Sequence, residues 1–141
     1  MIGAIITEFA ERFVPNGQLL YAGDTSKKMG FIDRPRLAEL GISVDDHGKM
    51  PDVVLYCGVR KWLILAEAVT SHGPVDGKRH EDLTTLFSPS GIGLVFVTAF
   101  PDRQTMARYL PVIAWETAVW TADSPSHLIH FNGERFLGPY G

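Results

Sequence analysis

Two carboxylates flank an apolar stretch near the middle of the chain, and their spacing suggests a shared site. Residues 53–56 and 62–66 are short runs rich in Val, Leu, Ile, Tyr and Trp, separated by a polar break at 58–61 that begins with glycine. Runs of this length and composition favour a β-hairpin over a helix. With the break as the loop, Asp52 lies opposite Glu67 on the same face of the ribbon.

Opposed carboxylates repel each other, so this arrangement needs a compensating charge. Like charges directly opposite on a sheet are destabilising and shift each other's pKa. A divalent cation is the simplest compensation, because hard cations bind carboxylate oxygens. The alternative is a register that differs by one residue and leaves one carboxylate in solvent. Spacing alone leaves both interpretations open.

The composition is that of one globular domain, which we expect over residues 1–141. A chain of 141 residues with 45% hydrophobic and 21% charged side chains is able to bury a real core. No apolar run approaches the roughly 18 residues of a membrane helix, and the N-terminus lacks the features of a signal peptide. The single cysteine, Cys57, excludes an internal disulfide framework and suits a reducing compartment. We therefore expect a cytoplasmic protein without membrane association.

The net charge of −3 argues against a general nucleic-acid-binding surface. That objection is limited, because a site for metal-assisted phosphodiester cleavage itself needs acids. Local basic clusters are still able to meet phosphates, and they supply Lys27, Lys28 and Arg79 as candidate DNA-phosphate ligands. Composition alone does not indicate DNA.

The hydrophobic pattern predicts alternating helices and strands. Helices are expected over 2–13, 35–40, 77–87 and about 101–110, and strands over 18–22, the hairpin, 92–98, 117–121 and 128–131. Trp115 and Trp120 are expected in the core. Since there is no internal repeat and no linker, this order predicts a single-domain α/β sandwich, with a central mixed sheet flanked by helices.

Several segments resemble a known enzyme family. PDVVLY followed by WLILAEAVTSHGPVDGKR resembles the catalytic domain of the BsuBI/PstI family of type II restriction endonucleases, part of the PD-(D/E)XK nuclease class. YAGDTSKK, GLVFVTAFPDR, IAWETAVW and HFNGERFLGPY add matches in the same order over nearly the whole chain. The resemblance implies that family members are longer, and we expect that the N-terminal region that helps them read DNA is absent from this chain.

The resemblance implies a restriction-endonuclease-like fold and a Mg²⁺-dependent endodeoxyribonuclease. Asp52 and Glu67 are then the catalytic acids and metal ligands, and Asp24 of the GDT motif joins the metal site or holds a neighbouring basic group. Mg²⁺ takes one or two protein carboxylates and keeps several waters, which matches this set. The implied substrate is double-stranded DNA, cut at a palindrome of the CTGCAG kind to leave 5′-phosphate and 3′-hydroxyl ends. A homodimer is implied as well, because two-fold symmetry in protein and site go together.

One position departs from the pattern of the nuclease class. The class usually places a lysine two residues after the second acid, where this chain has Val69. Either the lysine has moved, or another residue does its work, or the site is impaired. Lys78 is the first candidate to replace it, because HGPVDGKR resembles the family there. His72, five residues beyond Glu67, is the second, as a general base or phosphate ligand.

Two other function classes remain open. A non-catalytic nuclease-fold domain, acting in DNA binding or assembly, also fits the acidic charge and the missing lysine. Two carboxylates are in addition the residue types that cleave glycosidic bonds, which would require an aromatic sugar-binding groove. Metal binding separates the three classes, since only the nuclease requires a divalent ion between Asp52 and Glu67.

Overall fold

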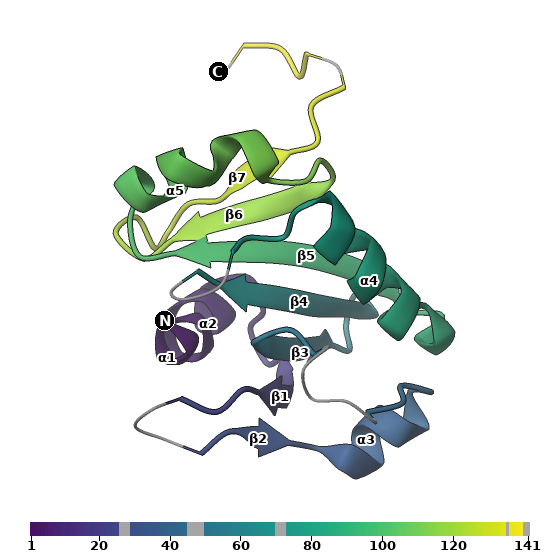
Figure 1. Ribbon diagram of the computed structural model, residues 1–141. Coiled ribbons are helices and arrows are strands. Elements are labelled where there is room, and N and C mark those ends of the chain that lie inside the picture. Colours follow the sequence, from purple (N-terminus) through teal and green to yellow (C-terminus); the bar gives the residue numbers. More distant parts are fainter. Residues whose placement is uncertain (26–28, 45–49, 70–72, 135, 140–141) are drawn as a thin grey trace.

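The fold is built on one mixed β-sheet, shown in Figure 1. The computed structural model describes residues 1–25, 29–44, 50–69, 73–134 and 136–139. The strands run in the order β2-β1-β3-β4-β5-β6-β7; β4, β5 and β6 are parallel neighbours, and the other pairs are antiparallel. Their bounds are β1 Gln18–Ala22, β2 Phe31–Ile32, β3 Val53–Cys57, β4 Trp62–Ala68, β5 Gly93–Phe100, β6 Thr117–Thr121 and β7 Ile129–Phe131.

Helices cover both faces of this sheet. On one face lies a single N-terminal helical segment, made of α1 (Ile2–Ala4), a π-helical stretch (Ile5–Phe9) and α2 (Ala10–Phe13). On the other face lie α3 (Arg34–Glu39), α4 (Gly77–Phe87) and α5 (Arg103–Tyr109), as Figure 1 shows for α4 and α5. Short 3₁₀ turns, Ser88–Ser90 and Leu110–Val112, follow α4 and α5. The predicted α/β sandwich with a central mixed sheet is confirmed.

Side chains of alternating direction divide the core between the two faces. Residues of β3 and β4 that point towards the N-terminal segment pack around Ile5 and Phe9, and include Val53 and Ile64. Their neighbours on the opposite face pack around the buried Leu83 of α4 in a second cluster. This alternation is the two-residue period of a strand buried on both sides.

The hairpin has the predicted register. Cys57 pairs with Trp62 and Tyr56 with Leu63, and the ladder ends at the pair formed by Val53 and Ala66. Asp52 therefore directly precedes the ladder on one strand, and Glu67 follows it on the other. The alternative register, shifted by one residue, is excluded.

The prediction that Trp115 lies in the core is wrong, since this side chain is 72% exposed in the bend before β6. Trp120 is fully buried, as predicted. The helix predicted over about 101–110 begins only at Arg103, because the Asp102 carboxylate accepts a hydrogen bond from the Thr105 amide (2.7 Å) and caps it. Within the described parts of the chain, no helix is long and apolar enough to span a bilayer.

Candidate active site

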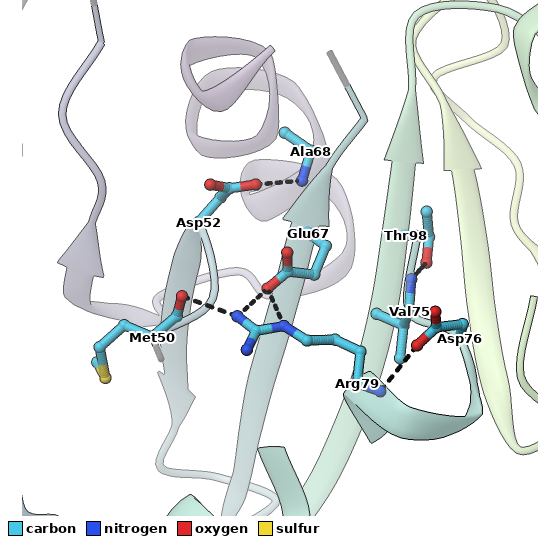
Figure 2. Close-up of polar contacts among 8 residues, drawn as sticks. All are labelled: Met50, Asp52, Glu67, Ala68, Val75, Asp76, Arg79 and Thr98. Atoms are coloured by element: carbon cyan, nitrogen blue, oxygen red, sulfur yellow. Dashed lines mark hydrogen bonds and ion pairs between the residues drawn. The ribbon is translucent and has the colours of Figure 1, made fainter. Parts of the chain in front are cut away.

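A cavity of about 550 Å³ opens where β3 begins and β4 ends, and both predicted acids line it. Figure 2 shows Asp52 and Glu67 on these neighbouring segments, with Arg79 reaching across from the first turn of α4. Lys78 and Asp24 line the same cavity. The remaining lining residues are Tyr21, Gly23, Met50, Pro51, Gly73, Pro74, Asp76 and Asp82.

Asp52 is held from both sides. Its carboxylate oxygen Oδ2 accepts a hydrogen bond from the Ala68 amide (2.7 Å), which ties it to the end of β4. Its backbone carbonyl accepts from the Gly23 amide (2.8 Å), which ties the same residue to the segment after β1. Its side chain is partly exposed, so the carboxylate is anchored yet accessible from the cavity.

Glu67 is a buried acid, only 7% exposed. Its pKa is raised to about 7, chiefly because burial disfavours the charged form; the guanidinium of Arg79 lowers this pKa, and the nearby carboxylate of Asp52 raises it. Nη2 and Nε of Arg79 donate to Oε1 of Glu67 at 2.9 and 3.3 Å. In this structure, an arginine therefore partly compensates the charges of the two facing carboxylates.

Arg79 connects three segments of the site. Besides Glu67, its Nη2 donates to the carbonyl oxygen of Met50 (2.9 Å), which directly precedes Pro51. Its backbone amide donates to Oδ1 of Asp76 (2.8 Å), the N-cap of α4. The sequence suggests DNA phosphates as partners of Arg79 and does not predict this ion pair with Glu67. The sequence does contain one indication of a special role for Arg79. Basic residues in the first turn of α4 oppose the helix dipole and are unfavourable for the helix by itself.

The start of α4 is fixed by the core of the sheet. The amide of Val75, a fully buried residue, donates to the hydroxyl of Thr98 in β5 (3.0 Å). Asp76 then caps the helix one residue later. Lys78 and Arg79 follow within the first turn, so the buried Thr98 indirectly determines where both basic side chains emerge.

Tyr21 and Asp24 form the side of the cavity next to β1. Burial raises the pKa of Tyr21, and the carboxylates of Asp24 and Asp52 raise it further. Oδ1 of Asp24 accepts a hydrogen bond from the Gly30 amide, and a Cβ at position 30 would collide with the Ala22 carbonyl, which explains the glycine. Asp24 thus links the segment after β1 to the residue directly before β2.

The predicted site residues are only partly brought together. Lys78 is exposed at the cavity, while His72, Lys27 and Lys28 lie outside the described residues. Among the described residues, no group of three or more His, Cys, Asp or Glu side chains is placed to hold a metal ion. The structure brings Asp52 and Glu67 together as a pair of carboxylates, and the metal-binding roles of Asp52, Glu67 and Asp24 stay predictions.

Val69, where the nuclease class places its lysine, is 3% exposed and packs against Phe100 and Met106 beneath α5. Its amide donates to the Ala99 carbonyl of β5 (2.9 Å), directly after the end of β4. The side chain at this position points into an apolar cluster, so it does not line the cavity.

The family model and the similar proteins found by comparison all indicate the same enzyme family. The model of the BsuBI/PstI restriction endonuclease domain matches residues 1–134. The type II restriction enzyme BsuBI of Bacillus subtilis is 65% identical over 140 residues, which are 99% of this chain and 44% of that enzyme. The type II restriction enzyme AplI of Arthrospira platensis is 33% identical over 144 residues, 97% of this chain and 44% of that enzyme.

A solved structure agrees with these sequence matches. The structure of the SdaI restriction endonuclease superposes with a TM-score of 0.89 at 51% identity, over 97% of this chain and 43% of that one. The chain thus spans less than half the length of the curated relatives that it matches.

Proposed function

The chain belongs to the family of BsuBI/PstI restriction endonuclease domains, and from this premise we propose that it is the catalytic domain of a Mg²⁺-dependent type II endodeoxyribonuclease. Its substrate is double-stranded DNA, hydrolysed to 5′-phosphate and 3′-hydroxyl ends. One observation carries the proposal. Asp52 and Glu67 meet at the ends of adjacent strands, in one cavity that also receives the basic side chains of Lys78 and Arg79.

The donor set of the cavity fits Mg²⁺. This ion favours oxygen ligands, takes one or two carboxylates and keeps several waters. Asp52 and Glu67 supply two carboxylates beside an open cavity of about 550 Å³, which leaves room for water and a phosphate. When bound, Mg²⁺ lowers the pKa of a coordinated water and stabilises negative charge on a phosphate oxygen.

The protein's own residues bind the cation, orient the reacting groups and stabilise developing charge. Asp52 and Glu67 hold the cation, and the amide of Ala68 keeps Asp52 in place (2.7 Å). Lys78, exposed at the cavity, orients the attacking water or stabilises charge that develops on the phosphate. His72 is the second candidate for this role.

Phosphate contacts complete the proposed interface. Lys27, Lys28 and Arg79 are the candidates, and they act on the DNA backbone rather than on base edges. We expect cleavage at a CTGCAG-like palindrome by a homodimer, because a two-fold symmetric site is cut by a two-fold symmetric enzyme. Base reading requires side chains in the grooves, and we expect the part of the relatives beyond this chain to contribute them.

A second candidate function is a nuclease-fold domain without catalysis, acting in DNA binding or assembly. The burial of Val69 favours it, since no lysine stands at the position that the class uses. The ion pair between Arg79 and Glu67 also favours this non-catalytic function, because a cation would have to share the carboxylate with the arginine.

Cleavage of supercoiled plasmid that carries CTGCAG sites, with Mg²⁺ at low salt, decides between the two. The proposal predicts cleavage by the wild type and none by Asp52→Asn, a variant of equal size that keeps an oxygen for the Ala68 amide. The control is Lys61→Met at the opposite end of the hairpin, because it removes a charge away from the cavity and is expected to leave cleavage intact. A folded but inactive wild type would favour the non-catalytic function, and cleavage by Asp52→Asn would contradict the site.

A further inference from the structure

The two acidic side chains are each tied to the protein through one oxygen. Oδ2 of Asp52 accepts from the Ala68 amide at 2.7 Å, and Oε1 of Glu67 accepts both Nη2 and Nε of Arg79. Figure 2 shows these donors on the side of each carboxylate away from its other oxygen. Oδ1 of Asp52 and Oε2 of Glu67 are therefore the oxygens best placed to bind a cation.

The donor to Glu67 is itself fixed. The guanidinium of Arg79 is anchored to the Met50 carbonyl (2.9 Å), and its backbone amide is anchored to Asp76 (2.8 Å). A planar guanidinium whose Nη2 also donates to the Met50 carbonyl presents two N–H groups to one carboxylate in a set geometry. Because Glu67 is 7% exposed, it has few other partners with which to adopt a different orientation.

We propose that Arg79 is a positioning residue for the divalent cation, acting through Glu67. It ties Oε1 and thereby directs Oε2 of Glu67 to the cation. It also supplies, from α4, a positive charge that the buried position of Val69 cannot supply from β4. This inference rests on the proposed function, since it concerns the same cation site. Lys78, one residue earlier and exposed, remains free to meet the phosphate.

The opposite role for the same ion pair makes a different prediction. If Arg79 merely neutralised Glu67 when no cation is bound, it would compete with the cation, and its removal would tighten binding. If Arg79 positions Glu67, its removal weakens binding, because a ligand that has lost its orienting partner must be ordered by the cation itself. Loss of an orienting partner of this kind typically weakens metal binding by about 10–100-fold.

Calcium titration without DNA tests this difference. Isothermal titration calorimetry with Ca²⁺, which occupies carboxylate sites, compares the wild type with Arg79→Met and Arg79→Lys. We expect binding about tenfold weaker or more for Arg79→Met, and an intermediate loss for Arg79→Lys, which keeps the charge but not the two-donor geometry. The matched control is Arg108→Met, an exposed arginine of α5 that does not line the cavity and leaves Ca²⁺ affinity unchanged.

The possible results separate this inference from the proposed function. Wild-type affinity or tighter binding in a folded Arg79→Met would overturn the positioning role and leave the proposed nuclease site intact. Absence of Ca²⁺ binding by the wild type would contradict both. If Arg79→Met does not fold, Arg79→Lys decides, because wild-type Ca²⁺ affinity in that variant would show that charge alone suffices and would refute positioning by the guanidinium.

Discussion

The buried acid Glu67 makes the stability of the metal-free protein depend on pH in an unusual direction. Its carboxyl group has a pKa raised from 4.5 to about 7, chiefly because burial disfavours the charged form. Between these two values the folded state binds more protons than the unfolded state. Stability therefore falls as pH rises from 4.5 to 7, the opposite of the usual behaviour of an acid. A pKa difference of this size changes the free energy of unfolding by about 3 kcal/mol over this pH range.

Replacement of Glu67 by glutamine tests this reasoning, because it keeps the size and removes the charge. Near pH 4.5 the variant and the wild type should have similar free energies of unfolding. Near pH 8 without divalent cations, Glu67→Gln should be more stable by up to about 3 kcal/mol, measured by urea unfolding at a series of pH values. The control Glu81→Gln removes an acid from an exposed position of α4, and its free energy of unfolding at pH 8 should not rise comparably above that of the wild type.

Parallel pH profiles for the wild type and Glu67→Gln would refute the reasoning, because they would show that Glu67 ionises alike in the folded and unfolded states. Added Ca²⁺ should reduce the difference in free energy of unfolding between Glu67→Gln and the wild type at pH 8. The reason is that Ca²⁺ stabilises only the wild type, which retains the Glu67 carboxylate. A buried acid that is kept for function is expected to lower the stability of the protein when its cation is not bound.

Three further substitutions have expected outcomes in urea unfolding. Asp76→Ala removes the cap that binds the Arg79 amide, and it should cost about 1 kcal/mol and weaken Ca²⁺ binding in calorimetry. Thr98→Val leaves the buried Val75 amide without its partner and should cost about 1–3 kcal/mol; no loss would show that this hydrogen bond does not fix the start of α4. Val69→Lys places a charge in an apolar cluster, so it should destabilise strongly and not improve plasmid cleavage.

The hairpin was predictable because its signals are local and agree with one another. A four-residue polar break between two apolar runs predicts the loop, and a loop of this length predicts which residues face each other. The sequence thus predicted that Asp52 faces Glu67 but left a shift of one residue open, and the ladder that ends at Val53 and Ala66 decides between the two registers. Most helices and strands were placed correctly for the same reason.

The ion pair of Glu67 with Arg79 was not predictable, because twelve residues and a loop separate the two side chains. Only the packing of α4 on the sheet brings the guanidinium over the end of β4. β2 was missed because two residues, Phe31 and Ile32, are too short to show a period. Trp115 was assigned to the core by residue type, yet it precedes β6 in a bend where no strand orients it inwards.

The central claim is that Asp52 and Glu67 together bind the catalytic cation. Anomalous diffraction from crystals soaked in Mn²⁺, which replaces Mg²⁺ in carboxylate sites, tests it most directly. The account predicts a single strong anomalous peak within coordination distance of both carboxylates, lost in crystals of Asp52→Asn. A peak elsewhere in the molecule, or an empty cavity at saturating Mn²⁺ in the wild type, would contradict it.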